Sequence, residues 1–314
     1  FGGYSSTYFH REIISYPFVD FILRGDSTER ATLKLVEAIR NGGDFSQVSN
    51  LTWKKNGRII VNDRMIVETH LNDFTNDYRT MFRKAVKYCS PVAMTPIHDW
   101  WRYPITMMVT CRGCKNNCAF CGGSNFAMKR FLDRRDVAFR DPERVARDVK
   151  DLSQFTTAPI FIVGDLRHAS DAYARTIIDR LVEGRVQNHL VLELFNAAPK
   201  AYFEALGSLA HVNFEISPET HDDALRKRSG KPYTTQQIED NITWALENGI
   251  EKFDVFFMIG IPGQDEASVM ETVEYAGLLM RRFGTRVMPF IAPLAPFLDP
   301  GSLAFEHSDR YGYT

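Results

Sequence analysis

Residues 104–121 read PITMMVTCRGCKNNCAFC. The first part, residues 104–110, is largely apolar and predicts a buried strand. The second part is a loop whose cysteines follow the spacing C-x3-C-x2-C, namely Cys114, Cys118 and Cys121. Barrels built from β/α units place their chemistry in the loops after the strands. The stretch therefore predicts a thiolate site directly after the first strand of such a barrel.

Downstream of this loop, apolar strands alternate with amphipathic helices. Such alternation produces parallel β/α units, and six units fall short of the eight in a closed barrel. The predicted fold class is therefore α/β, with a partial (β/α)6 barrel. The predicted strands are residues 104–110, 160–163, 190–195, 212–216, 253–259 and 286–292, and the predicted helices are 142–155, 171–182, 199–209, 235–248 and 266–283.

The residues before the barrel predict a smaller and less regular region. Gly25 ends an apolar run, and Asn56-Gly57 is a typical two-residue hairpin turn. Residues 4–18 read as a polar loop. The other predicted elements are a strand at 19–25, a helix at 27–39, a hairpin of 51–53 with 59–61, and a helix near 73–88 within a linker.

Composition excludes several classes of protein. The 314 residues carry a net charge of −1, so no basic excess indicates nucleic-acid binding and no acidic excess indicates disorder. The longest apolar run, 287–298, is interrupted by three prolines and is too short for a membrane helix. No secretory signal is visible, which predicts a cytoplasmic protein. The first residue is Phe1 rather than Met, and we expect the chain to be a fragment of a longer protein.

The cysteine count points to a metal or redox site. Four of the five cysteines fall within eleven residues, a clustering that a disulfide framework does not explain in a chain without an export signal. In a 4Fe-4S cluster each iron takes one outside ligand, so three cysteines leave one iron open to a substrate. Two alternatives stay open when Cys111 is added: a closed four-cysteine cluster for electron transfer, and a structural zinc site in a binding module.

The C-x3-C-x-aromatic-C loop after a barrel strand resembles the radical S-adenosylmethionine (SAM) superfamily. Arg112-Gly113-Cys114 resembles its cobalamin-associated branch, where the position of Cys111 is commonly a small serine. The resemblance implies an oxygen-sensitive 4Fe-4S cluster on Cys114, Cys118 and Cys121, with Cys111 and Cys89 as bystanders. It further implies that SAM binds the open iron and is reductively cleaved to a 5′-deoxyadenosyl radical, which abstracts hydrogen from a substrate. A one-electron reductant such as flavodoxin or ferredoxin is the expected partner.

The resemblance also assigns SAM contacts to residues after the later strands. Each residue has a plainer interpretation: a capped turn for Gly164 and Asp165, a solvated lysine for Lys231, a simple turn for Ile259 and Gly260, and core packing for Phe120. The implied contacts are Gly164 and Asp165 with the ammonium group, Glu215 and Ser217 with the ribose, Lys231 with the carboxylate, and Phe120, Ile259 and Gly260 with the adenine.

The region before the barrel resembles the end of a doubly wound, Rossmann-like cobalamin-binding domain. The usual Gly-Glu-Gly-Glu reads Gly25-Asp26-Ser27-Thr28-Glu29 here, which is a departure. The branch implies cobalamin-dependent methyl transfer to a small molecule or biosynthetic intermediate, with ring formation and rearrangement as its other activities. The predicted domains are a truncated cobalamin-binding remnant at 1–45, a linker at 46–103, the barrel at 104–300, and the start of a C-terminal region at 301–314.

Overall fold

Two parts of the chain each have a core of their own. The computed structural model describes residues 1–63, 65–75, 77–90, 100, 102, 104–294 and 298–313. We call the part that contains the cysteine loop the cysteine unit and the other part the barrel unit. The cysteine unit comprises residues 1–69, 112–138 and 295–314, and the barrel unit comprises residues 70–111 and 139–294.

A parallel sheet of six strands forms the centre of the barrel unit. Its strands are β4 (Thr106–Val109), β7 (Ile160–Val163), β8 (Leu190–Leu194), β9 (Val212–Glu219), β10 (Lys252–Ile259) and β11 (Val287–Pro293). The order across the sheet is β11-β10-β9-β8-β7-β4, so each strand lies beside the next one along the chain. All the pairings in this sheet are parallel. Successive β/α units produce this order, which confirms the predicted partial barrel.

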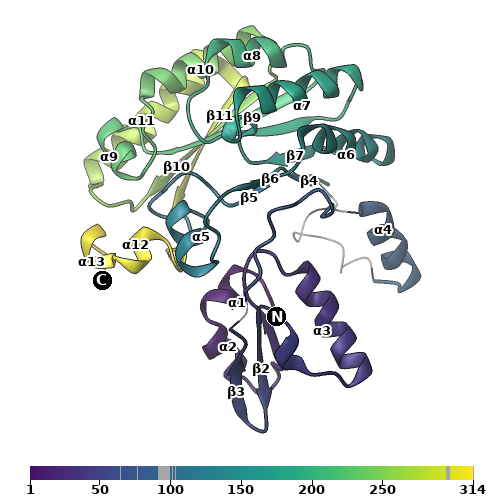
Figure 1. Cartoon of the computed structure of the whole chain (residues 1–314). Coiled ribbons are helices and arrows are strands. Elements are labelled where there is room, and N and C mark those ends of the chain that lie inside the picture. Colours follow the sequence, from purple (N-terminus) through teal and green to yellow (C-terminus); the bar gives the residue numbers. More distant parts are fainter. Residues whose placement is uncertain are drawn as a thin grey trace. The chain divides into compact units, whose positions relative to one another are not determined.

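Helices cover one face of this sheet (Figure 1). Strand residues alternate between the two faces, so on β9 Phe214 and Ile216 are buried while Glu215 lies on the opposite, less buried face. The buried face packs against helical side chains such as Phe203, whose ring centroid lies 5.4 Å from that of Phe214. The helices of the barrel unit are α4 (Tyr78–Lys87), α6 (Pro142–Phe155), α7 (Asp171–Glu183), α8 (Lys200–Leu206), α9 (Asp223–Arg228), α10 (Thr235–Glu247) and α11 (Glu266–Phe283), and the covering layer is formed by α6, α7, α8, α10 and α11 (Figure 1).

Local signals account for the best-predicted elements. Pro142 stands in the first turn of α6, and the Asp141 side chain caps the helix by accepting a hydrogen bond from the Arg144 backbone amide. α6, β7 and α11 have the bounds that the sequence predicts. α9 was not predicted, and β9 continues three residues past the predicted end at residue 216, as far as Glu219.

An antiparallel sheet, β1-β2-β3, lies in the cysteine unit. Its strands are β1 (Phe21–Leu23), β2 (Leu51–Lys55) and β3 (Arg58–Val61). Asn56 and Gly57 both have positive φ in the turn between β2 and β3, which confirms the predicted hairpin. α3 (Glu29–Asn41) packs on one face of the sheet through Leu35, against Leu23 and Trp53. The predicted domain boundary at residue 45 runs through this sheet, because β1 pairs with β2.

Short helices complete the cysteine unit. The predicted polar loop after Gly3 is helical instead, because Ile14 anchors these turns against Val19 and Ile22 in a small core of their own. The short strands β5 and β6 lie where the chain passes between the units. The elements are α1 (Tyr4–Tyr8), α2 (His10–Ser15), β5 (Cys111–Arg112), α5 (Asn125–Phe131), β6 (Ala138–Phe139), α12 (Leu303–Glu306) and α13 (Ser308–Tyr311), with 3-10 turns at Phe45–Gln47, Leu166–His168 and Gly284–Arg286.

A buried ion pair fixes the cysteine-containing segment to the first strand region within this unit. The Arg134 side chain is almost fully buried and pairs with Asp26. It also donates hydrogen bonds to the Ser27 hydroxyl at 3.0 Å and to the Glu68 carbonyl at 2.9 Å. Each of these acceptors satisfies part of a guanidinium that would be costly to bury alone. Among the described residues, no helix has the length and apolar character needed to cross a bilayer.

Candidate active site

The cysteine loop is held in shape by its own hydrogen bonds. The Asn125 backbone donates to the Asn116 carbonyl at 2.8 Å, and its side chain donates to the Cys114 carbonyl at 2.9 Å. The Cys121 backbone donates to the Cys118 carbonyl at 3.3 Å. These bonds tie all three cysteines to the start of α5, so the loop is organised by the protein itself.

Backbone amides also face two of the sulfurs. The Asn116 amide lies 3.4 Å from the Cys114 sulfur, and the Gly123 amide lies 3.2 Å from the Cys121 sulfur. Hydrogen bonds of this kind surround protein-bound iron–sulfur clusters and tune them. Burial raises the pKa of the Cys114 thiol, and the nearby Cys121 raises it further. A cation bound at the loop would offset both effects by stabilising the thiolates.

The spacing of the sulfurs bears on the choice of metal. A single zinc ion binds sulfur at about 2.3 Å, which places tetrahedral sulfurs roughly 3.8 Å apart. In the part of the chain that the structure describes, no three cysteine sulfurs lie within 4.8 Å of one another. The three sulfurs of the loop therefore do not surround a single point at zinc–sulfur distance.

Gly113, directly before Cys114, is a position that only glycine fits. Its φ is +92°, and a Cβ there would lie 2.7 Å from Cδ of the buried Arg134. We expect Gly113→Ala to destabilise the protein by about 2–3 kcal/mol and to lower iron loading, measured by denaturant unfolding and by iron analysis. Gly2→Ala is the matched control, because a Cβ there would lie 3.6 Å from its nearest contact, the Leu23 carbonyl, which is an ordinary distance. Equal effects of the two substitutions would contradict this explanation.

Phe120 lies in the core of the cysteine unit. Its side chain is 9% exposed, and its ring meets that of Tyr311 edge-on at 6.5 Å. The neighbouring Ala119 carbonyl accepts a hydrogen bond from the Ala304 backbone at 2.9 Å. The structure thus gives Phe120 a packing role, and its predicted contact with adenine stays a prediction.

In the barrel unit, the end of β7 meets the end of β8. Gly164 has a φ of +97°, and its amide donates to the Glu193 carboxylate at 2.6 Å. The buried Asp165 carboxylate accepts from Arg167 at 2.6 Å and from the Phe195 amide at 3.0 Å. Asp165 therefore serves the turn, as in its plainer interpretation. Glu193, which the sequence did not single out, is the carboxylate held beside Gly164.

The predicted residue Glu215 stands between two other acids. Sheet register places Glu193 of β8 and Asp254 of β10 directly beside it, one on each neighbouring strand. Burial, Glu193 and Asp254 together raise the pKa of Glu215 to about 7, against an opposing effect of Lys252. Such a carboxyl is partly protonated near neutral pH and is able both to donate and to accept a hydrogen bond.

The raised pKa of Glu215 predicts a pH dependence of stability. Because the folded-state pKa of about 7 exceeds the ordinary glutamate value of 4.5, the stabilising contribution is complete below about pH 4.5 and is lost as the pH rises through 7. Glu215→Gln removes this loss, so we expect the variant to be about 1–2 kcal/mol more stable than the parent at pH 8, after allowance for solvent screening.

The measurement is the free energy of unfolding by denaturant at pH 5 and pH 8. At pH 5 the difference between Glu215→Gln and the parent is expected to be much smaller than at pH 8. Glu204→Gln, at an exposed position of α8, is the matched control and is expected to show no pH-dependent gain. A gain that does not change with pH would show that the titration of Glu215 is not its cause.

Lys231 reaches the end of β9 and pairs there with a second carboxylate that sequence reasoning missed. Its ammonium group forms an ion pair with Glu219 and donates to the Ser217 carbonyl. The Tyr233 hydroxyl donates to the same carbonyl at 3.1 Å. Ser217 thus takes part in this group of hydrogen bonds through its backbone carbonyl. The Lys231 side chain is 13% exposed and is ion-paired rather than free in solvent.

Glu219 has two further unusual features. Its φ is +68°, a left-handed conformation that is uncommon and costly for a residue with a side chain. Its side chain is buried, and its Oε2 atom has no hydrogen-bond partner. A buried carboxylate oxygen without a donor is costly. This oxygen is therefore able to accept a hydrogen bond from a hydroxyl or amine of a bound molecule.

The loop after β10 is closed by one side chain. The Gly260 and Ile261 amides donate to the Gln264 side-chain oxygen at 2.9 Å and 3.1 Å, and the Gln264 amide group donates back to the Met258 carbonyl at 3.1 Å. Gly260 has a φ of +95°, and the Ile259 side chain is 37% exposed. At the carboxyl end of β10 the loop thus exposes the Ile259 side chain, and no atom of the described residues beyond its chain neighbours would lie within 4 Å of a Cβ at Gly260.

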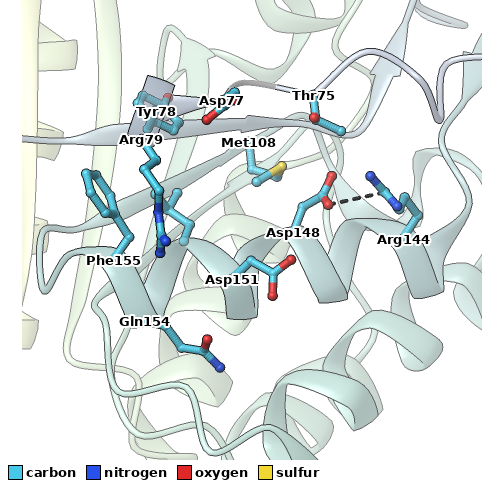
Figure 2. Close-up of a pocket in the computed structure, with 11 residues that line it drawn as sticks. Thr75, Asp77, Tyr78, Arg79, Met108, Arg144, Asp148, Asp151, Gln154 and Phe155 are labelled. Atoms are coloured by element: carbon cyan, nitrogen blue, oxygen red, sulfur yellow. Dashed lines mark ion pairs between the residues drawn. The ribbon is translucent and has the colours of Figure 1, made fainter. Parts of the chain in front are cut away.

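A hollow of about 400 Å³ lies beside β4, between α4 and α6 (Figure 2). Arg144 and Asp148 form an ion pair of 3.2 Å in its wall. The Tyr78 hydroxyl accepts from the Met107 amide at 2.8 Å and donates to the Met107 carbonyl at 3.0 Å, which satisfies the edge of the sheet. None of the predicted site residues lines this hollow, so we do not assign it to the candidate active site.

The residues that sequence reasoning missed are Glu193, Asp254 and Glu219. The first two occupy predicted strands, but only the sheet register shows that they flank Glu215. Glu219 follows the predicted end of its strand by three residues. The sequence feature that could have drawn attention to Glu219 is that it is a second carboxylate shortly after Glu215.

Comparisons with known proteins agree on the kind of fold. Residues 108–276, more than half of the chain, match the model of the radical SAM superfamily. The chain is 24% identical over 166 residues to the anaerobic magnesium-protoporphyrin IX monomethyl ester cyclase of Synechocystis sp.. The aligned segment covers 52% of this chain and 30% of that protein. The chain thus spans about a third of the length of this curated relative.

Two solved structures share the fold over nearly the whole chain. The radical SAM methyltransferase TsrM from Kitasatospora setae, solved with cobalamin and a [4Fe-4S] cluster, has a TM-score of 0.72 at 13% identity, covering 98% of this chain and 57% of TsrM. The cobalamin-dependent SAM radical enzyme OxsB, solved with aqua-cobalamin, has a TM-score of 0.65 at 13% identity, covering 98% of this chain and 41% of OxsB.

Proposed function

The chain belongs to the radical SAM superfamily, and on that premise we propose that it is an enzyme that binds a 4Fe-4S cluster through Cys114, Cys118 and Cys121 and cleaves SAM reductively. The observation that carries the proposal is the three-cysteine loop, organised by its own hydrogen bonds inside the segment that matches the family. When bound, the cluster supplies the electron for cleavage of SAM to a 5′-deoxyadenosyl radical, the chemistry that the superfamily shares.

The thiolate set fits the cluster. Its three sulfurs come from one loop of eight residues, so the loop binds the cluster from one side. The amides of Asn116 and Gly123 face two of these sulfurs and stabilise the thiolates. Cys111 stands in the barrel unit, where its sulfur would lie 3.8 Å from a Cβ at Gly164. We keep Cys111 outside the proposed ligand set, because the spacing C-x3-C-x2-C is complete without it.

We propose that polar groups at the carboxyl ends of β7, β8 and β9 bind SAM. The unpaired Oε2 of Glu219 is suited to accept a hydrogen bond from a ribose hydroxyl, and the ion pair with Lys231 holds the carboxylate in place. Glu193 and Glu215 supply further acceptors for an ammonium or hydroxyl group on the less buried face of the sheet. The predicted role of Lys231 at the SAM carboxylate thus becomes, in this proposal, the orientation of Glu219.

The finer proposal is cobalamin-dependent methyl transfer to a small-molecule substrate. Its support is the fold shared with TsrM and OxsB over 98% of the chain, which includes residues 1–45. We propose that these residues belong to the cobalamin-binding part of the protein. The match to a cyclase favours ring formation as a second candidate reaction. Flavodoxin or ferredoxin is the proposed electron donor in either case.

Anaerobic reconstitution tests the proposal. Protein loaded with iron and sulfide and reduced with dithionite or flavodoxin is expected to show a cluster signal in electron paramagnetic resonance that changes when SAM is added. It is also expected to release 5′-deoxyadenosine. A well-formed cluster that neither responds to SAM nor cleaves it would favour an electron-transfer protein instead. Hydroxocobalamin added to the same sample tests the finer proposal through bound cobalt after gel filtration.

A further inference from the structure

Two histidines and a glutamate meet at the amino ends of three neighbouring strands of the barrel unit. His189 immediately precedes β8, His211 precedes β9, and Glu251 precedes β10. The Glu251 carboxylate lies between both imidazoles: one oxygen is 2.7 Å from Nε2 of His189, and the other is 2.5 Å from Nδ1 of His211. One ligand atom from each of the three side chains lies within 4.8 Å of the other two.

The backbone of all three residues is fixed by the sheet. The His189 carbonyl accepts from the Ile160 amide at 2.8 Å, and the His211 carbonyl accepts from the Leu190 amide at 3.0 Å. The Glu251 amide donates to the Val212 carbonyl at 2.9 Å. Three potential ligands thus project from adjacent, hydrogen-bonded strands, which is the rigid support that a metal site needs.

Side-chain hydrogen bonds also fix the residues directly before these strands. The Asn188 side chain donates to the Thr156 and Ala158 carbonyls, each at 2.8 Å, which fixes the turn before His189. Arg286 donates to the Ile250 carbonyl at 2.5 Å, directly before Glu251. The three residues are therefore held near one another by the fold as well as by their mutual hydrogen bonds.

We propose that His189, His211 and Glu251 bind a zinc ion. Two imidazoles and a carboxylate are a typical zinc ligand set, with the fourth position left to water or another outside ligand. Ligands about 2.0–2.1 Å from a tetrahedral zinc lie roughly 3.3 Å apart, so the present nitrogen–oxygen separations need to open by less than about 1 Å. The side chains are 38%, 42% and 40% exposed, which leaves them room to turn and gives the ion access.

This site is separate from the proposed radical chemistry. Glu193 and Glu215 lie further along β8 and β9, toward the carboxyl ends where the SAM contacts are proposed. The amino-terminal end of a barrel generally serves stability rather than catalysis. A zinc ion bound here links β8, β9 and β10 by ligand bonds, so its role is to stabilise the barrel unit.

Zinc analysis of the cluster-loaded chain tests the proposal. After equilibration with Zn²⁺ and gel filtration, we expect one zinc per chain, with X-ray absorption showing nitrogen and oxygen ligands at about 2.0–2.1 Å and no sulfur at about 2.3 Å. The double variant His189→Ala/His211→Ala is expected to lose that equivalent, while its iron content stays unchanged. Addition of Zn²⁺ is expected to raise the melting temperature of the parent protein and not that of the variant.

His221→Ala is the matched control, because His221 also lies beside a carboxylate, with Nε2 at 3.2 Å from Glu271, but has no second histidine in its group. It is expected to retain the zinc. Glu251→Gln provides a second test should the double variant fail to fold, and it is expected to weaken zinc binding at least tenfold. The proposal would be overturned if His189→Ala/His211→Ala and Glu251→Gln both retained zinc, or if the zinc were bound through sulfur. His189, His211 and Glu251 would then only hydrogen-bond to one another.

Discussion

Replacement of Cys118 by alanine is expected to abolish both cluster binding and SAM cleavage. Cys118 supplies one of three thiolates, and a loop with two thiolates cannot hold a cluster that takes one outside ligand at each of three irons. Iron content after anaerobic reconstitution is expected to fall from about four per chain to near zero. The release of 5′-deoxyadenosine is expected to fall to the level of a sample without protein.

The fold is expected to survive this change, because the Cys118 contact that fixes the loop is made by its backbone carbonyl, which alanine retains. Cys114→Ala and Cys121→Ala are expected to behave in the same way. Cys111→Ala and Cys89→Ala are the matched controls, and both are expected to keep the cluster. Loss of iron in Cys111→Ala would show four-cysteine ligation and would contradict the proposed open iron.

Glu219→Gln is expected to weaken SAM binding by on the order of a hundredfold. The substitution removes the charge from a buried carboxylate whose Oε2 has no partner within the protein, and a hydrogen bond to a charged acceptor contributes about 1.5–3 kcal/mol. The same change leaves the largely enclosed Lys231 ammonium without its counter-charge. We therefore also expect the free energy of unfolding to fall by about 3 kcal/mol.

A double variant separates these two effects. Glu219→Gln/Lys231→Met removes both charges, so its stability is expected to return to within about 1 kcal/mol of the parent protein. SAM affinity, measured by equilibrium binding to cluster-loaded protein, is expected to stay low. Recovery of affinity together with stability would show that Glu219 acts only through its ion pair and has no contact with SAM.

Local sequence patterns were sufficient for the elements that carry their own signals. α6 begins at a proline that follows a capping aspartate, and its predicted bounds are those observed. The alternation of strands and helices predicted the order of the sheet, because short right-handed connections leave few other arrangements. The cysteine spacing predicted a metal loop, since its three proposed ligands lie within eight residues and need no knowledge of distant contacts.

Local patterns failed where packing between distant segments decides the conformation. The segment after Gly3 has little apolar periodicity, yet Ile14 packs with Val19 and Ile22 and makes it helical. The strand predicted at 19–25 is present as β1, but its antiparallel pairing with β2 was not predicted and is shown only by the structure. Pairing of this kind depends on which segments meet, a property that no single window of sequence contains.

The sequence by itself predicted the family, the partial barrel and the three proposed cluster ligands. The family and the ligands depend on cysteine spacing within one loop, and the barrel depends on the alternation of strands and helices along the chain. Only the tertiary structure showed that Glu215 stands between Glu193 and Asp254, and that Lys231 is paired with Glu219. The physical reason is that charge acts through space. A carboxyl group takes its pKa and its partner from neighbouring strands, and those neighbours are set by sheet register rather than by distance along the chain.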